Sequence, residues 1–400
     1  MPIIDEHIKL GDRRIVGQTH ALEQVESIFQ SERLSHAYLI TGPQGAGKTA
    51  FALAMAEAIN GVDHLTDLKG SAISRKSSWY THPDIHLFIP LPTSAGATEL
   101  NERLKLLSKD PYEIVDFSLR PDLKNDSSSK NKRAFYFIDY YRDEIRPKTV
   151  LKPNEGRRTI MVITGIDTMR KEAANAFLKL LEEPAGNVMF ILTADKTDQL
   201  LPTIMSRCQQ IRLAPLTRQE ISDGLVNHDN YSRADADFLA RVSGGNYAYC
   251  RYMDLKELQK TREETVDFLR YAYTQDAPSL VPLVEGWQTR LNLEGQIALS
   301  NTLELLLRDI MIYRETQNRD LLTNIDQLEV IEKFCTSLKD AKLELMIEEL
   351  HKLKQLFYQN VQFKLIFTSL AFRYGNLMRG NEPFISNKTP WQHLPAFSDS

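Results

Sequence analysis

Short, uninterrupted apolar stretches alternate with helical patterns over the first half of the chain. Many of their residues are β-branched or aromatic, and turn or helix signals bound the stretches at 35–41, 86–90, 159–164, 188–194 and 210–215. Apolar runs of this length without polar alternation are typical of strands that are buried on both faces. The pattern therefore predicts an α/β domain in which a parallel sheet is flanked by helices on both faces.

Helical spacing of apolar residues fills the gaps between these stretches. Helices are predicted at 49–60, 170–183 and 200–205. The second of these helices is followed by Pro184, with Gly186 behind it, and this pair supplies the stop.

Beyond Pro215 the chain reads as helical throughout. Thr217 and Glu220 have the spacing of a capping box, which predicts a helix start. A Gly244–Gly245 pair interrupts a small helical unit, and from about 282 to 379 no strand period is present. One helical face of that last stretch carries Leu343, Ile347, Leu350 and Phe357. Such a stripe is usually the core of a helical bundle, and it can extend to helices of a partner.

These patterns divide the chain into four parts. We predict an α/β domain over 1–214, a small helical domain over 215–275, an all-helical domain over 276–380 and a tail over 381–400. Residues 120–133 have five basic and two acidic residues, a serine triplet and no apolar periodicity, so they are interpreted as an insertion. Two roles stay open for the insertion, a solvated surface loop or a contact to DNA phosphates.

Composition and charge narrow the class of protein. Hydrophobic residues make up 42% and charged residues 26% of the chain, as in soluble globular proteins, and the net charge of −4 excludes a surface that is basic throughout. Cys208, Cys250 and Cys335 are too far apart for a disulfide framework, which predicts a reducing compartment. The first residues show no basic start before an apolar block, and no apolar run approaches the length of about 18 residues that a membrane span needs. We therefore expect a soluble, cytoplasmic protein.

Residues 42–49, GPQGAGKT, match the phosphate-loop pattern G-x-x-x-x-G-K-[ST] in full. The motif lies directly after a predicted strand and opens a predicted helix, where backbone N–H groups can surround a phosphate. Lys48 can reach the β and γ oxygens, and the Thr49 hydroxyl can ligate Mg²⁺. The motif predicts a site for ATP or ADP with Mg²⁺, and a vestigial loop is the alternative. Neither interpretation says whether the chain hydrolyses ATP.

Hydrolysis needs a carboxylate at the tip of a neighbouring strand, to hold the Mg²⁺ shell, and a group that orients water. The relevant strand ends in Thr164 and Gly165, and neither residue is acidic. Asp167 follows, where we expect it to cap the next helix. Glu182 and Glu183 close a helix and are expected to be solvated. Little or no ATP turnover by the isolated chain is therefore predicted.

Ser206-Arg207-Cys208 lies at a predicted turn from a helix into a strand. A guanidinium that is fixed at such a turn suits the recognition of a phosphate. From the motif alone, a surface salt bridge of Arg207 is the alternative.

Several motifs in this order resemble a known family. They are Val16-Gly17-Gln18, the phosphate loop, His82-Pro83-Asp84, AANAFLKLLEEP, LLPTIMSRCQ and PLT. The chain is similar to the bacterial clamp-loader subunits of the AAA+ class, and within that family it most resembles the delta-prime subunits of DNA polymerase III. The motifs cover about 15–215, and beyond them only the helical layout agrees.

The resemblance implies an AAA+ domain, a helical lid and a helical collar, assembled in a hetero-pentamer with delta and gamma or tau subunits. Such assemblies open a ring-shaped sliding clamp and load it on primed DNA. The resemblance also implies that Arg207 reaches into the ATP site of a neighbouring subunit as an arginine finger. The nucleotide-binding residues that it implies, together with the phosphate loop, are Val16, Gly17, Gln18, Gly42, Gly45, Ala46, Gly47, Lys48, Thr49 and, at a strand-end sensor position, Thr193.

Zinc is the first point at which the chain departs from the family's pattern. Related subunits often carry four cysteines in a zinc module, but residues 65–81 contain no cysteine, so no zinc site is predicted. His64, His82 and His86 are scattered, and scattered histidines are more often structural residues than metal ligands.

Two further departures concern ATP hydrolysis. Thr164 and Gly165 replace the acidic pair at the strand end, and Ala248 stands where a sensor arginine is usual in the lid. Both favour a non-motor subunit, without polymerase activity of its own, that binds nucleotide and completes a partner's active site. An autonomous ATPase, such as a gamma or tau motor subunit or a helicase loader, is the alternative that the intact phosphate loop supports. A small-molecule kinase is a third hypothesis, which leaves the helical C-terminal third without a purpose.

Overall fold

Two compact units, Met1–Met253 and Asp254–Ser400, make up the chain in the computed structural model. The structure describes residues 9–10, 13–30, 34–61, 79–80, 82–93, 95–118, 120, 123, 133–184, 186–251, 255–291, 293–357 and 361–381. Most of the predicted insertion at 120–133, the tail beyond 381 and His64 therefore lie outside the described residues.

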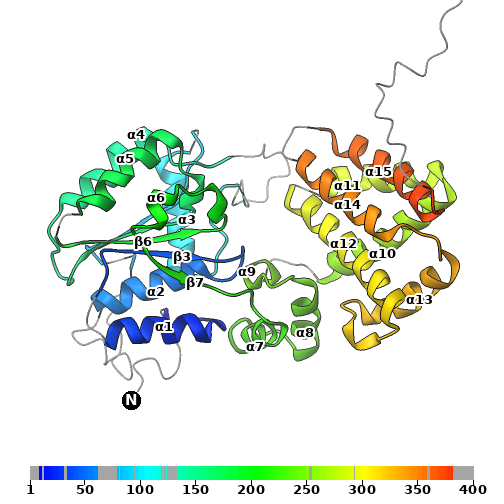
Figure 1. Ribbon diagram of the computed structural model, residues 1–400, viewed down its shortest axis with the longest axis horizontal. Coiled ribbons are helices and arrows are strands. Elements are labelled where there is room, and N and C mark those ends of the chain that lie inside the picture. The colour runs from blue at the N-terminus through cyan, green and yellow to red at the C-terminus, as the bar shows by residue number, and fades with distance from the viewer. Residues whose placement is uncertain are drawn as a thin grey trace, which may run out of the picture. The chain divides into compact units, whose positions relative to one another are not determined.

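Five parallel strands form the centre of the first unit (Figure 1). They are β3 (Ala37–Thr41), β4 (Ile85–Phe88), β5 (Thr159–Ile163), β6 (Val188–Ala194) and β7 (Gln209–Arg212), in the spatial order β4-β5-β6-β3-β7. Every residue of β3, β5 and β6 is buried, which explains their uninterrupted apolar sequence. The predicted parallel sheet is thus confirmed.

Helices cover both faces of this sheet. Figure 1 shows α1 (Thr19–Gln30) and α2 (Lys48–Gly61) on one face, and α4 (Ile138–Tyr140) and α5 (Lys171–Glu182) on the other. Phe177 of α5 meets Phe190 of β6 edge-on, with the ring centroids 5.3 Å apart. The remaining elements of this part are the antiparallel pair β1 (Lys9–Leu10) and β2 (Arg13–Arg14), α3 (Ala97–Lys109), a π-helical turn at Tyr141–Ile145, 3-10 turns at Arg146–Val150, Ile166–Thr168 and Thr197–Gln199, and α6 (Pro202–Met205).

Three helices complete the first unit, namely α7 (Arg218–Asp229), α8 (Arg233–Val242) and α9 (Tyr247–Cys250). The predicted capping box at the start of α7 is confirmed. The backbone N of Glu220 donates to Thr217 Oγ1 at 3.2 Å, and the backbone N of Thr217 donates to Glu220 Oε2 at 2.8 Å. These bonds satisfy amides that a helix start leaves without intrahelical acceptors.

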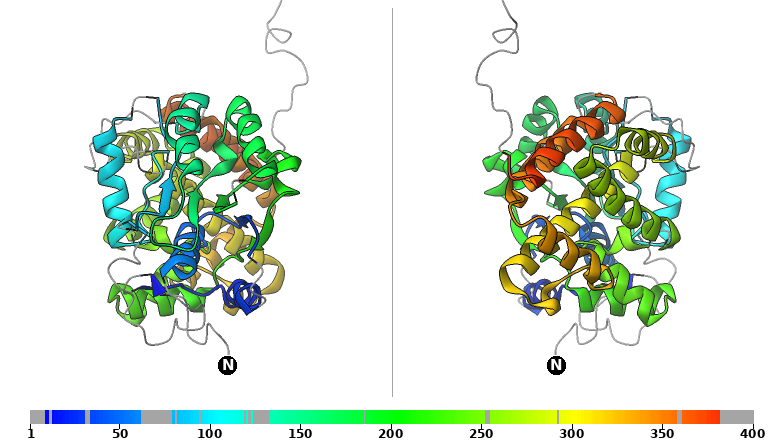
Figure 2. Two further views of the ribbon diagram at one scale, coloured as in Figure 1. Left: turned by 90° about the vertical axis from the view of Figure 1, so that its left-hand side faces the viewer. Right: turned by 90° about the vertical axis from the view of Figure 1, so that its right-hand side faces the viewer.

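The described part of the second unit is helical. Its elements are α10 (Leu255–Thr274), α11 (Ala277–Arg290), α12 (Leu293–Thr316), 3-10 turns at Arg319–Leu321 and Ile325–Gln327, α13 (Leu328–Ser337), α14 (Leu343–Leu356) and α15 (Phe363–Met378). Figure 2 shows α15, in red, beside the yellow-green helices α10 and α11. Among the helices that the structure describes, none is long and apolar enough to cross a membrane.

The core of the second unit includes α10, although the sequence pattern predicts this helix as part of the small helical domain at 215–275. Phe268 of α10 is fully buried, and its ring centroid lies 5.5 Å from that of Trp287 and 5.8 Å from that of Phe367. An amphipathic pattern identifies a helix but not the core that it joins, and this is why the predicted boundary at 275 differs from the observed division at 253. The rest of the predicted domain division stays a prediction. The predicted stripe lies in this same core, where Leu343, Leu350 and Phe357 are buried and Ile347 is partly buried.

Candidate functional site

The phosphate loop connects the end of β3 to the start of α2, as predicted. Its backbone needs glycine, because φ is +153° at Gly42, +80° at Gly45 and +87° at Gly47. A Cβ atom at Gly42 would also lie 2.6 Å from the carbonyl oxygen of Leu213, which follows β7. The loop is therefore closely packed against the end of the neighbouring strand.

Lys48 is the first residue of α2, and only 7% of its side chain is exposed. Its Nζ atom donates to the carbonyl oxygens of Gly42, at 2.9 Å, and Pro43, at 2.6 Å. The same Nζ lies 2.7 Å from Oδ1 of Asp195, directly beyond β6. The ammonium group of Lys48 is thus bound by oxygens of its own chain.

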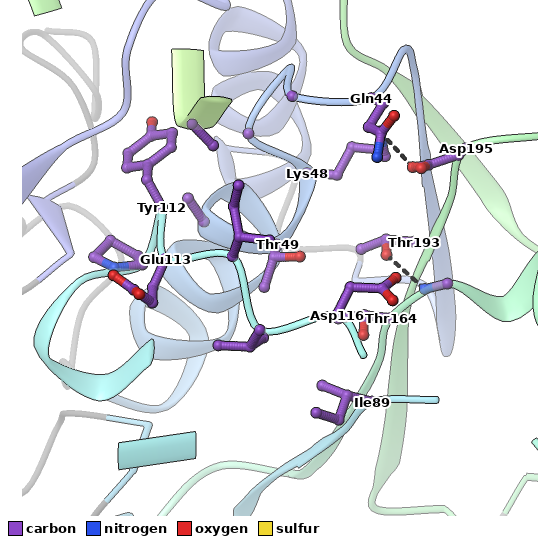
Figure 3. A pocket seen from close by; sticks show the side chains of 18 of the residues that line it. Gln44, Lys48, Thr49, Ile89, Tyr112, Glu113, Asp116, Thr164, Thr193 and Asp195 are labelled. Carbon is purple, nitrogen blue, oxygen red and sulfur yellow. Dashed lines mark hydrogen bonds and ion pairs between the residues drawn. The ribbon is translucent and has the colours of Figure 1, made fainter. Parts of the chain in front are cut away.

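A pocket lies beside the loop (Figure 3). Its volume is ≈ 160 Å³, below the range of about 300–1,000 Å³ that is usual for ligand pockets. The predicted site residues that line it are Gly45, Gly47, Lys48, Thr49 and Thr193. The rest of its wall consists of Gln44, Ala50, Ile89, Pro90, residues 111–116, Thr164, Gly165, Asp195 and Ala248.

The predicted base-binding residues lie next to the loop, although they are not among the residues that line this pocket. Gln18 Nε2 donates to the carbonyl oxygens of Ala46, at 3.1 Å, and Ala214, at 2.8 Å. Gly17 and Gln18 both have positive φ, +61° and +64°, so Val16-Gly17-Gln18 form a tight turn. The structure therefore brings this turn and Ala46 of the phosphate loop together.

Tyr112 joins the turn to the pocket, and sequence reasoning missed it. The backbone N of Val16 donates to the Tyr112 hydroxyl at 2.8 Å, and the Tyr112 ring meets the Tyr247 ring edge-on at 5.0 Å. A Cβ atom at Gly47 would lie 3.1 Å from the Tyr112 ring. The only local sequence signal is Pro111 before it, which indicates a turn and no function.

The end of β5 carries no acid, as the sequence requires, and its polar groups bind within the chain. Thr164 Oγ1 donates to the carbonyl oxygen of Phe88 at 3.2 Å, and the backbone N of Gly165 donates to Thr193 Oγ1 at 3.1 Å. The Thr193 hydroxyl therefore contacts the strand end where an acidic pair would stand.

Three carboxylates reach the pocket from loops instead. Asp195 is paired with Lys48, Glu113 with Arg120 at 2.5 Å, and Asp116 accepts a hydrogen bond from the backbone N of Ser118 at 2.6 Å. A search for acids at the end of β5 could not find them, because Asp195 directly follows β6 and because Glu113 and Asp116 lie beyond α3.

The prediction that Asp167 caps the next helix is wrong. α5 begins after Arg170, which has no side-chain cap bond, and the Asp167 carboxylate instead accepts the backbone N–H groups of Asp195, at 3.3 Å, and Lys196, at 3.2 Å. Burial, and then the neighbouring charge of Asp195, raise the pKa of Asp167. Asp167 therefore orders the chain beyond β6.

Arg207 lies at the turn between α6 and β7 and is not among the residues that line the pocket. Its Nη2 atom lies 2.8 Å from Oε1 of Glu182, and its Nη1 atom donates to the carbonyl oxygen of Thr203 at 2.9 Å. Arg207 thus forms a surface salt bridge, which is one of the two roles that its sequence position allows, and its partner Glu182 is half exposed.

His82 and Asp84 organise a turn. The backbone N of Asp84 donates to His82 Nδ1 at 3.1 Å, and the Asp84 carboxylate accepts the backbone N–H groups of residues 154–156 at 2.6 to 2.8 Å. Within the described ranges, no three His, Cys, Asp or Glu side chains are grouped so that they could hold a metal ion. His64, residues 65–78 and Thr81 lie outside those ranges.

Comparison with known proteins relates the chain to subunits of DNA polymerase III. A model of the family DNA polymerase III, delta subunit, matches residues 17–217. The chain is 22% identical to DNA polymerase III subunit delta' of Bacillus subtilis over 348 residues, which are 86% of this chain and 92% of that protein. It is 27% identical to subunit delta' of Pseudomonas aeruginosa over 258 residues, 64% of this chain and 66% of the relative.

Tau and gamma subunits of DNA polymerase III are similar over a shorter range. The chain is 27% identical to DNA polymerase III subunit tau/gamma of Haemophilus influenzae over 213 residues, 53% of this chain, and it spans only 25% of that protein. The phosphate loop on a parallel sheet, followed by helical parts, is the expected AAA+ architecture, and this class implies nucleotide binding. Because the family model matches half of the chain, from the Gly17 turn through the phosphate loop to the helix cap at Thr217, the chain belongs to the DNA polymerase III, delta subunit, family.

Proposed function

We propose that this protein acts as a delta-prime-type subunit of a DNA polymerase III clamp loader and helps to load a sliding clamp on primed DNA. The similarity to the delta' subunit of Bacillus subtilis carries the proposal, because it extends over 92% of that protein. It thereby includes helices of the second unit, whereas the match to tau/gamma covers only 53% of this chain. Delta and gamma or tau subunits are the partners in the assembly.

Arg207 acts in trans on the ATP site of a neighbouring subunit. Two observations support this role: the guanidinium stands at a turn outside its own chain's pocket, and Glu182 and Thr203 fix its direction. A planar guanidinium suits a transferred phosphate, because it offers several donors in a fixed plane.

The chain's own site binds ATP or ADP with Mg²⁺ and does not hydrolyse it. Lys48 contacts the β and γ phosphates, the Thr49 hydroxyl ligates Mg²⁺, and Val16, Gly17 and Gln18 surround the base, while no zinc is required. The order of the loop supports binding, and Thr164 and Gly165 at the end of β5 support the lack of hydrolysis.

Reconstitution tests the proposal. The chain is mixed with delta, tau or gamma and the sliding clamp of the same organism, and clamp loading on primed DNA is measured with and without it. We expect loading only when this chain is present. Loading that is complete without it would contradict the proposed role.

A motor ATPase is the second candidate, because Glu113, Asp116 and Asp195 do bring carboxylates to the pocket. Steady-state ATP turnover by the isolated chain separates the two functions. A non-motor subunit shows only a trace of turnover that Lys48→Ala leaves unchanged, whereas a motor shows turnover that Lys48→Ala abolishes.

A further inference from the structure

The site beside the phosphate loop is filled at both ends by side chains of the chain itself. We propose that Tyr112 and Asp195 compete with nucleotide for this site, Tyr112 for the base and Asp195 for the phosphates. Nucleotide then binds only by displacing them. This regulation rests on the nucleotide binding proposed above and adds the two residues that set its affinity.

Tyr112 holds a backbone donor next to the loop. The amide of Val16 is buried and donates to the Tyr112 hydroxyl at 2.8 Å. The turn that carries this amide is tied to Ala46 of the phosphate loop by Gln18, so it lies within reach of a base whose phosphates rest in the loop. A backbone N–H is a natural partner for a ring nitrogen of a base, and here the phenol oxygen accepts it instead.

The Tyr112 ring also takes up space. It is 5% exposed, lies between Gly47 and the Tyr247 ring, and forms part of the pocket wall. The remaining ≈ 160 Å³ is small for a ligand pocket, for which about 300 Å³ is a usual minimum. A bound nucleoside therefore requires that this ring move.

Asp195 competes at the other end. Figure 3 shows the Lys48–Asp195 ion pair and Tyr112 on opposite sides of Thr49. A phosphate that binds Lys48 has to replace the Asp195 carboxylate, which carries the same sign of charge and lies 2.7 Å from Nζ. Asp195 is 43% exposed and can move toward solvent, whereas Lys48 is buried.

The segment around Tyr112 is anchored on both sides. Asp110 is paired with Arg251, which follows α9 and also binds Asp229 at 2.9 Å. On the other side, fully buried Arg103 of α3 donates to the carbonyl oxygen of Val115 at 3.1 Å. Displacing Tyr112 therefore works against fixed neighbours, and the competition lowers the affinity for nucleotide.

Two ligands separate the two ends in calorimetric titrations of the full chain. Mg²⁺–ATP contacts both ends, whereas Mg²⁺–tripolyphosphate contacts only the phosphate end. Tyr112→Phe keeps the ring and removes the oxygen that holds the Val16 amide. Because one hydrogen bond has a net value of about 0.5–1.5 kcal/mol, we expect about two- to tenfold tighter ATP binding and unchanged tripolyphosphate binding.

Asp195→Asn should strengthen the binding of both ligands by about tenfold or more, because a charged partner of Lys48 is neutralised. Tyr273→Phe and Asp198→Asn are the matched controls and should bind as the wild type does. Melting temperatures check that all variants are folded.

The outcomes distinguish this regulation from the nucleotide binding on which it rests. If the wild type, Tyr112→Phe and Asp195→Asn bind ATP equally well, the competition is wrong while nucleotide binding stands. If none of the three binds ATP or tripolyphosphate at millimolar concentration, the proposal of nucleotide binding is wrong, and the proposal of competition is then wrong as well.

Discussion

Arg207 and Glu182 form an ion pair in which Nη2 of the arginine lies 2.8 Å from Oε1 of the glutamate. Glu182 is the last residue of α5, and Arg207 lies between α6 and β7, so the pair connects two separate elements. Both side chains are partly exposed, at 33% and 49%, and such pairs add no more than about 1 kcal/mol to folding. The main effect of the Arg207–Glu182 pair is therefore to fix the direction of the guanidinium group.

Arg207→Ala should slow ATP turnover in the assembled complex and leave assembly intact. Arginine fingers contribute about 10³ to 10⁵ in rate, because they stabilise charge on the transferred phosphate. Arg207→Lys should restore little of the ATP turnover, since an ammonium group lacks the planar, forked geometry of a guanidinium. Arg233→Ala is the matched control, because Arg233 also forms a surface ion pair, with Asp223 at 2.7 Å. ATP turnover at the wild-type rate with Arg207→Ala would show that Arg207 is no finger.

Glu182→Ala should reduce the same turnover by a smaller factor, about three- to tenfold, because one charge-assisted hydrogen bond that orients the guanidinium is lost. Glu183→Ala is the neighbouring control and should have no effect. The double variant of Arg207 and Glu182 should be no slower than Arg207→Ala alone. Additive losses would mean that Glu182 acts independently of Arg207.

Glu57 makes the stability of the first unit depend on pH. Burial raises the pKa of this α2 carboxyl to about 7, although the backbone N of Trp79, which donates to Oε1 at 2.7 Å, lowers it in part. Between pH 4.5 and pH 7 the unfolded chain loses this proton before the folded chain does, so stability falls as pH rises. A pKa of about 7 in place of 4.5 corresponds to about 3 kcal/mol.

Glu57→Gln should therefore match the wild type near pH 4 and be more stable by up to about 3 kcal/mol at pH 8. Urea unfolding at both pH values, with pulse proteolysis to score the first unit separately, measures this difference. Glu172→Gln, on the exposed face of α5, is the control. An equal stability of Glu57→Gln and wild type at both pH values would contradict the raised pKa.

The elements of this chain were predictable where a local pattern determines them. The strands β3, β5 and β6 are buried on both faces, so their sequence is continuously apolar, and Thr217 with Glu220 caps α7 as the spacing indicates. The phosphate loop was found because its glycines are needed by the backbone itself.

Contacts between distant segments were not predictable in the same way. Tyr112, Asp195 and the true position of Asp167 depend on which loops meet at the end of the sheet, and no spacing in the sequence encodes this meeting. The membership of α10 in the second core has the same cause, because its amphipathic face fits either neighbour until the partner residues are known.

Phe268→Ala should destabilise the second unit by about 3–5 kcal/mol. Phe268 is fully buried and packs against the rings of Trp287, Phe367 and Tyr374, so its removal leaves a cavity among rigid side chains. Phe372→Ala, on the same unit but with a side chain that is 61% exposed, should change the free energy of unfolding by no more than about 0.5 kcal/mol. Urea unfolding followed by tryptophan fluorescence compares the two, and equal losses would place Phe268 outside the core.

The position of β3 determines when the nucleotide site can form during synthesis. β3 ends at Thr41, yet both strands that pair with it, β6 and β7, begin only at Val188 and Gln209. At about 5–20 residues per second, the ribosome needs on the order of 10 s to add the intervening chain. The Gln18–Ala214 bond, which connects the turn at Val16 to the end of the sheet, can form only later, because Ala214 is synthesised after β7. The phosphate loop is therefore among the first motifs to be made and among the last to be assembled, so a nascent chain has no nucleotide site until the last strand of its sheet has been synthesised.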